Sequence, residues 1–268
     1  MIHNIGKQRV ISCQLDPARA QALHVVLGCE GNAPKTSDPL PPFWHQIYFW
    51  DPLTEAQLGR DGHTAKGRFI PDLGLPRRMW ASGALQFHAP LLIGHEAVKT
   101  STIEDVQLKN GRSGPLGFCT VRHDISQNDK LCVTERQILV FRQDPTPGGP
   151  KPVMKQARLN EIRKITQSFS PTTLFRYSAL TLNGHRIHYD EPYAQDIEGY
   201  PGIVVHGPLL AQIMMQMATD KGDLAGFEWR NSAPLFAGEE GDFCEFSDCW
   251  QLRGADGRLI VEASAKYR

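Results

Sequence analysis

A segment rich in proline and glycine near the middle of the chain restricts the fold more than any other feature of the sequence. The segment Asp144–Pro152 (DPTPGGPKP) holds four prolines and two glycines among its nine residues. Proline lacks a backbone N–H and breaks helices and central strands, so regular structure is not expected to continue through this segment. The sequence therefore predicts an N-terminal unit over residues 1–143, a linker over 144–152 and a C-terminal unit over 153–268.

The composition is that of a globular protein without a strong electrostatic partner. Hydrophobic residues make up 41% of the chain, enough for a sizeable core, and 29 basic residues balance 29 acidic ones. A net charge near zero gives no long-range attraction to nucleic acid or to a membrane surface. The start of the chain lacks an apolar signal region, and the six cysteines show no C-x-x-C spacing, which indicates reduced thiols. We expect a cytoplasmic protein with no nucleic-acid or membrane partner.

Two pairs of segments have the composition of β-hairpins. In the first unit, residues 117–125 and 130–142 are rich in β-branched and aromatic residues and flank the turn sequence SQND. In the second unit, residues 242–253 and 258–265 flank the turn sequence GADG. We therefore predict antiparallel strands in both units.

An amphipathic helix is predicted over Gly207–Asp220. Pro208 suits the first helical turn, where a missing N–H costs little. The wide apolar stripe suits a helix enclosed by a curved sheet, which permits a hotdog fold without demonstrating it. The residues at helical spacing that form this stripe are Leu209, Leu210, Ile213, Met214 and Met217.

The densest polar cluster of the chain is predicted to be a functional loop. Residues 177–193 (YSALTLNGHRIHYDEPY) carry many groups able to move protons or bind anions, and loops hold functional residues disproportionately. The sequence VVHGPL follows at residues 204–209, where the predicted helix begins. The polar groups of the cluster are Asn183, His185, Arg186, His188 and Asp190.

This arrangement suits the addition or removal of water next to an acyl thioester. The reaction needs a base for the water, an acid for the α-carbon and donors for the thioester oxygen as it gains enolate charge. A histidine suits the proton transfer, and we assign that role to His188. The unpaired N–H groups at a helix start suit the oxygen, and we assign the main donor to the backbone of Gly207, which has no side chain to block the thioester.

The same stretches resemble a known family. Residues 176–209 (RYSALTLNGHRIHYDEPYAQDIEGYPGIVVHGPL), residues 58–94 (LGRDGHTAKGRFIPDLGLPRRMWASGALQFHAPLLIG) and residues 233–239 (APLFAGE) resemble the type 2 hydroxyacyl-thioester dehydratases, relatives of the MaoC-like hydratases. The similarity runs from about Trp44 onward. It implies an α+β double hotdog, in which each of two units is a curved antiparallel sheet around a central helix. It also implies an acyl-CoA hydratase that needs no metal or redox cofactor, similar to family members that hydrate mesaconyl-C4-CoA or itaconyl-CoA.

The family's catalytic pattern is only partly present. MaoC-like hydratases commonly show D-x-N-P-x-H-x-D, in which His188 and Asp190 match the final H-x-D and Asn183 takes the place of the first Asp. An amide is no base, but it can orient a water or hold the His188 ring. The missing carboxylate is then either not needed or supplied from elsewhere, with Asp190 as the nearest candidate. A turn or capping role for Asp190 is an equal alternative.

The substrate contacts are less defined by the sequence. Arg78 can pair with a terminal carboxylate, which would make the substrate a dicarboxylic acyl-CoA. Trp80 lines the acyl pocket or belongs to the core. Arg186 contacts CoA phosphate, a substrate carboxylate or only solvent. Tyr177 and His206 complete the expected contacts, and a homo-oligomer is compatible with the sequence.

Three other functions stay open at this point. A hotdog thioesterase would use the same helix start with a water-activating group. A non-haem iron oxygenase would use His188, Asp190 and His206 as metal ligands. A binding module without catalysis would explain the amide at position 183.

Overall fold

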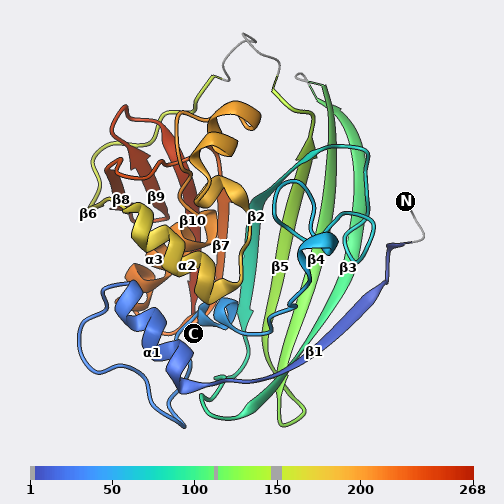
Figure 1. Ribbon diagram of the computed structural model, residues 1–268. Helices are drawn as coiled ribbons and strands as arrows, with labels where there is room; N and C mark the ends of the chain where they lie inside the picture. Colours follow the sequence, from blue (N-terminus) through green and yellow to red (C-terminus); the bar gives the residue numbers. More distant parts are fainter. Residues whose placement is uncertain (1–3, 112–113, 146–152) are drawn as a thin grey trace.

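The computed structural model describes residues 4–111, 114–145 and 153–268, and ten of its strands form one antiparallel sheet (Figure 1). The predicted linker lies outside the described residues except for Asp144 and Pro145. The strands of the first half are β1 (Gln8–Gln14), β2 (Arg77–Phe87), β3 (Glu96–Gly111), β4 (Gly114–Gln127) and β5 (Lys130–Arg142). Those of the second half are β6 (Arg163–Gln167), β7 (Leu224–Asn231), β8 (Gly241–Glu245), β9 (Trp250–Gly254) and β10 (Leu259–Tyr267).

The strand order repeats between the two halves. The sheet runs β1-β3-β4-β5-β2-β7-β10-β9-β8-β6, so each half places its first strand at an outer edge and its second at the centre. The two central strands pair antiparallel, with Gly83 opposite Trp229 and Leu85 opposite Phe227. Two units of equal topology thus share one continuous sheet, which confirms the predicted α+β double hotdog.

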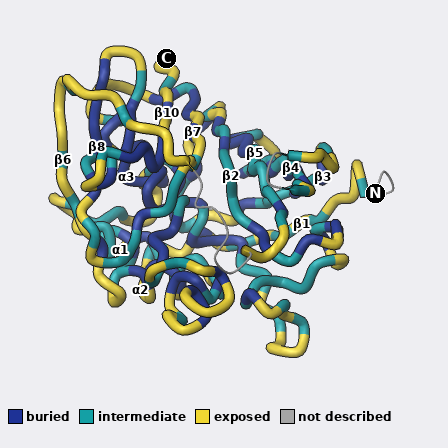
Figure 2. The backbone as a smooth tube through the Cα atoms, turned by 90° about the horizontal axis from the view of Figure 1, so that it is seen from above, coloured by how far each residue is buried: buried dark blue, intermediate teal, exposed yellow. Residues whose placement is uncertain are grey.

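The helix of the C-terminal unit lies inside the curve of its strands. Helix α3 (Gly207–Thr219) begins at the predicted residue, and nine of its residues are buried. Figure 2 shows α3 almost entirely as buried tube, with β6, β8, β10 and β7 around it. Its partner α2 (Pro171–Thr181) is capped by Ser170, whose Oγ accepts the Thr173 N–H at 3.1 Å. Enclosure on all sides explains why the apolar stripe of α3 is so wide.

The N-terminal unit has a shorter helix and a longer connection. Helix α1 (Pro17–Val26) lies beside α2, at the lower left of the molecule in Figure 1. The segment from α1 to β2 then covers part of the inner face of β3–β5, where Phe69, Leu73 and Leu75 pack in one apolar cluster with Ile103 and Phe141. The short helices of this connection are η2 (Trp44–Ile47) and η3 (Glu55–Gln57).

The predicted hairpins are confirmed with one correction. Asn128 and Asp129 form the two-residue turn between β4 and β5, both with positive φ, as a tight hairpin requires. The GADG turn joins β9 to β10. Residues 242–253, however, are not one strand: the Phe246 N–H bonds to the Cys249 carbonyl at 2.9 Å and closes a turn between β8 and β9. The apolar Phe246 and Cys249 hid this turn from the hydrophobic pattern.

Residues 177–193 are also more ordered than a loop. The stretch begins within α2 and continues through two short helices, η4 (Arg186–His188) and the π-helix η5 (Tyr193–Ile197). The polar composition of α2 concealed its helical face. No helix among the described residues is long and apolar enough to cross a membrane.

Candidate active site

His188 lies at the end of η4 with its ring almost fully buried. Its side chain is 6% exposed, and its Nδ1 lies 2.7 Å from the carbonyl oxygen of Val204. A carbonyl only accepts hydrogen bonds, so Nδ1 carries the proton and Nε2 presents its lone pair. No hydrogen bond from the described residues engages Nε2. The ring is therefore fixed in the tautomer that can accept a proton at Nε2.

Burial also keeps this ring neutral. Desolvation lowers the pKa of His188 to about 4, and the hydrogen bond to the Val204 carbonyl opposes this only in part. At neutral pH the imidazole is uncharged and ready to act as a base.

His206 holds His188 beside the start of α3. The two rings stack with centroids 3.7 Å apart and planes 18° apart, and His206 is the residue that immediately precedes α3. His206 is itself fully buried, and its Nε2 lies 2.8 Å from the hydroxyl of Ser178 on α2. The hydrogen bond with Ser178 thus fixes His206, and the stacked His206 ring fixes the orientation of the His188 ring.

The first turn of α3 has free backbone donors. His206 makes no side-chain cap, and no acceptor among the described residues binds the Gly207 N–H. A Cβ on Gly207 would lie 2.8 Å from Nδ2 of Asn231, so a larger residue here would displace Asn231 or the first turn. Unpaired N–H groups at the positive end of a helix dipole suit an oxygen that gains negative charge.

A loop of the N-terminal unit completes the site. Gly62 has φ +81° and packs so closely on Gly184 that a Cβ on it would lie 2.0 Å from the Gly184 carbonyl oxygen. The Asp61 carbonyl accepts the Arg186 N–H at 3.0 Å. Through this contact the ring of His63 lies 4.6 Å from that of His185, which lies 5.4 Å from that of His188. The site is thus shared between the two units.

Arg78, on β2, lies at the inner side of this loop. It is 8% exposed, and its Nη2 lies 3.5 Å from Asp61 Oδ2 and 3.4 Å from the Thr64 carbonyl oxygen. Its buried Nε has no partner among the described residues. The guanidinium therefore keeps unused donors, as the predicted role in carboxylate binding requires.

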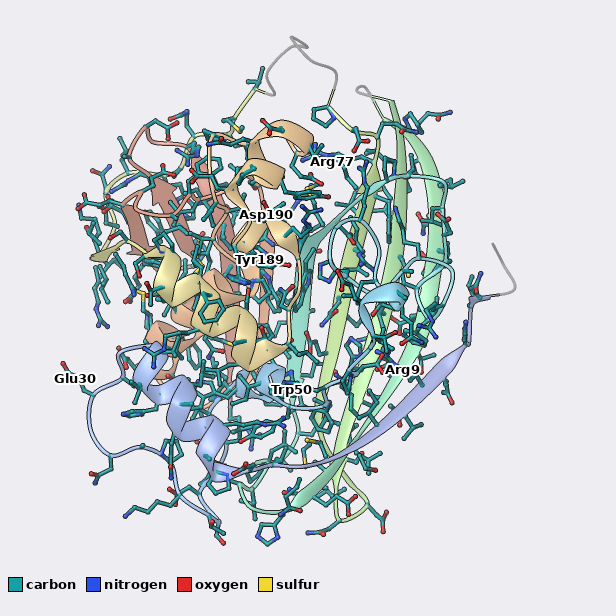
Figure 3. All side chains as sticks on the ribbon, in the orientation of Figure 1. Arg9, Glu30, Trp50, Arg77, Tyr189 and Asp190 are labelled. Carbon is teal, nitrogen blue, oxygen red and sulfur yellow. The ribbon has the colours of Figure 1, made fainter. Side chains whose placement is uncertain are left out.

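Asn183, Asp190 and Arg186 are occupied in shaping the catalytic segment. Asn183 Oδ1 accepts the His185 N–H at 3.1 Å, which makes a local turn. Asp190 Oδ1 accepts the Tyr193 N–H at 3.1 Å, and its Oδ2 pairs with Arg186 at 2.7 Å. Figure 3 shows Asp190, next to Tyr189, on the segment that links α2 to α3. These contacts match the turn and capping alternative for Asp190, while direct catalytic roles for Asn183 and Asp190 stay predictions.

Aromatic side chains line the inner part of the molecule beside the site. The Tyr177 ring lies 5.0 Å from that of His206, and its buried hydroxyl has no partner among the described residues. The Trp80 ring lies 6.2 Å from Phe43 and 5.7 Å from Trp229, while the Trp80 carbonyl accepts Asn231 Nδ2 at 2.8 Å. Trp80 thus belongs to the packed seam between β2 and β7, and its contact with an acyl group stays a prediction.

Four residues of the site were not selected from the sequence. Asp61 and His63 lie in the RDGH sequence that carried part of the family resemblance, but nothing local indicated that they reach the second unit. Ser178 and Asn231 gave no signal, because each acts through a contact made only in the folded chain. Among the described residues, no group of three or more histidine, cysteine, aspartate or glutamate side chains is arranged to hold a metal ion.

The joined units and the buried histidine beside a helix start define a double-hotdog protein with a histidine-based site. A sequence model of the family "hydroxyacyl-thioester dehydratase type 2" matches residues 43–237. The chain therefore belongs to this family.

Individual relatives agree in sequence and in fold. The chain is 44% identical to the mesaconyl-C(4)-CoA hydratase of Chloroflexus aurantiacus, over 98% of this chain and 96% of the relative. It is 29% identical to the mitochondrial hydroxyacyl-thioester dehydratase type 2 of Schizosaccharomyces pombe, over 79% and 80% of the two chains. The fold is similar to that of HtdX of Mycobacterium tuberculosis, with a TM-score of 0.69 at 16% identity over 98% and 100% of the chains. A double-hotdog protein of the same organism gives a TM-score of 0.55 at 14% identity over 97% and 95%.

Proposed function

We propose that this chain is a hydro-lyase that adds water to, or removes it from, the α,β double bond of a short dicarboxylic enoyl-CoA. The observation that carries the proposal is the neutral His188 ring, with its free Nε2, held beside the uncapped start of α3. A base and an oxyanion donor in this arrangement are what the reaction needs. We further propose that the enzyme is cytoplasmic and needs no metal or redox cofactor.

The proposed steps balance with His188 as the one proton carrier. Nε2 takes a proton from water while the water oxygen bonds to the β-carbon. The electrons of the C=C bond then move towards the thioester oxygen, where the Gly207 N–H stabilises the enolate charge. His188 returns the same proton to the α-carbon, and the ring is neutral again. Dehydration is the reverse sequence.

The substrate class rests on Arg78 and on the relatives. The Chloroflexus relative is named for a CoA thioester of a dicarboxylic acid, and Arg78 keeps unused donors in the same site. A guanidinium with free donors suits a carboxylate better than an apolar chain end. We therefore place mesaconyl-C4-CoA and itaconyl-CoA ahead of crotonyl-CoA as substrates.

The test is a hydration assay with mesaconyl-C4-, itaconyl- and crotonyl-CoA, followed by loss of enoyl absorbance, product mass and free thiol. We expect hydrated product without thiol release, with the dicarboxylic substrates preferred. His188→Gln should lower kcat by roughly 10²–10⁴-fold, because it removes the proton acceptor. His95→Gln, a change of an exposed histidine, should have no effect. Thiol release without hydrated product, or a fully active His188→Gln variant, would overturn the proposal.

A further inference from the structure

A dicarboxylic substrate would upset the balance of charge around Arg78. Asp61, 5% exposed, already neutralises Arg78. A second carboxylate that bound to the free Nε side of Arg78 would therefore add a net negative charge to a buried site. Such a charge is costly unless a proton or a cation accompanies it.

His63 is placed to supply that proton. Its ring lies 4.6 Å from that of His185, and its backbone N–H donates at 3.1 Å to Asp61 Oδ1, an oxygen of the carboxylate that pairs with Arg78. No hydrogen bond among the described residues engages its side chain. Desolvation first, and then the charge of Arg78, keep its pKa well below the ordinary value, so the ring is neutral without substrate. A carboxylate bound between Arg78 and His63 would offset the positive charge of Arg78 and would stabilise a proton on the imidazole. Its binding would therefore favour the imidazolium form.

The surroundings offer no stronger candidate for proton uptake among the described residues. His188 must stay neutral to act as the base, His206 is fully buried and bonded to Ser178, and His185 is more deeply buried than His63. Lys66 donates hydrogen bonds from Nζ to the carbonyls of Leu75 and Pro76. The titratable or charged groups that act on His63 or on its partner Arg78 are Asp61 and Lys66 from its own loop, Arg78 from β2, His185 and His188 from the catalytic segment, and His206 at the start of α3.

We propose that His63 is a specificity-determining residue that takes up a proton when the free carboxylate of a dicarboxylic acyl-CoA binds between it and Arg78. This inference rests on the proposed function and extends it. The bound carboxylate would then face two cationic donors, while a monocarboxylic acyl-CoA would find a neutral imidazole and an Arg78 paired with Asp61. Selectivity for dicarboxylic substrates would come from this coupled protonation, separate from the chemistry at His188.

The test is calorimetric binding of saturated ligands, which cannot be hydrated, in buffers of different ionisation enthalpy. With the wild-type protein at neutral pH, freshly prepared succinyl-CoA should bind with uptake of about one proton and butyryl-CoA with none. His63→Gln keeps an N–H donor but cannot be protonated. It should abolish the uptake and weaken succinyl-CoA binding about tenfold, with butyryl-CoA binding unchanged, because a Gln side chain cannot become a cation beside the bound carboxylate.

Controls separate this inference from the proposed function. His95→Gln should retain the proton uptake, and thermal melting should confirm that each variant is folded. Equal uptake for both ligands, uptake that persists in His63→Gln, or succinyl-CoA binding no tighter than that of butyryl-CoA would each overturn the inference. Hydration by the wild-type protein is measured separately, so its absence would instead overturn the proposed function.

Discussion

His188 shows how a single side chain acquires a defined chemical role from its surroundings. The Val204 carbonyl selects its tautomer, the stacked His206 ring sets its orientation and burial lowers its pKa to about 4. None of these influences needs a carboxylate. This explains how the site can retain a working base although an amide, Asn183, stands where the family pattern has an aspartate.

The pH dependence of activity should report the lowered pKa of His188. With crotonyl-CoA, which lacks a free carboxylate and binds without proton uptake at His63, we expect kcat/KM to stay nearly constant as the pH falls through 6.5, the ordinary histidine value, and to decline with a midpoint near 4. The same shift costs stability in acid, because below pH 6.5 the unfolded chain binds a proton that the folded ring refuses. Rates should therefore be measured by brief transfer to each pH, with circular dichroism to confirm folding. An acid limb centred near 6.5 in the folded enzyme would contradict this prediction.

At the scale of elements, α3 serves both as the core of its unit and as a functional terminus. Its apolar spacing, its Pro208 and its glycine start are local features, so the sequence predicted its first residue correctly. The chain around it was harder to predict. Helix α2 was hidden by polar residues that face solvent, and the β8–β9 turn by apolar residues that flank it. The period of the apolar residues indicates which positions are buried. It does not reveal a partly exposed helix such as α2 or a short turn flanked by apolar residues.

Gly207→Ala should impair the helix start without unfolding the unit. The new Cβ would lie 2.8 Å from Asn231 Nδ2, so either Asn231 or the first turn must move. If the first turn moves, its N–H groups no longer face the thioester oxygen, and we expect kcat to fall by up to roughly 10²-fold, the order seen when an oxyanion donor is lost. Gly202→Ala is the matched control, because its Cβ would meet its nearest atom, Glu191 Oε1, at an ordinary 3.6 Å. Equal kcat for both variants would contradict the expectation that the close fit of Gly207 against Asn231 positions the first turn for catalysis.

At the scale of the whole molecule, the site depends on how the two units meet. The sequence predicted the start of α3 at Gly207, which the structure confirms, and with its family resemblance it predicted the division into units and a catalytic role for His188. They did not predict that Asp61 and His63 would reach the catalytic segment, because the residues in contact are more than a hundred positions apart. The pairing of β2 with β7 brings them together, and no local pattern encodes that pairing.

Gly62→Ala tests this contact between units. The substitution combines an unfavourable positive φ with a backbone clash at the Gly184 carbonyl, so the loop must withdraw from the catalytic segment. We expect a loss of kcat/KM of about tenfold or more, well beyond the effect of Gly74→Ala. Gly74 has φ +70° in the same connection but open space around it, and its replacement should cost only about 1 kcal/mol of stability. The readouts are steady-state kinetics and denaturant titration. Equal effects of the two variants would show that the contact is dispensable.

The β2–β7 seam has a consequence for how such a protein can change. In an assembly of two identical subunits, every substitution appears on both sides of the symmetry axis, so a base and an anion-binding loop must coexist in each copy. Here the seam joins halves of one polypeptide, and a change at His63 or Arg78 leaves the opposite half untouched. One half can therefore be altered towards a new acyl group while the other preserves its proton chemistry.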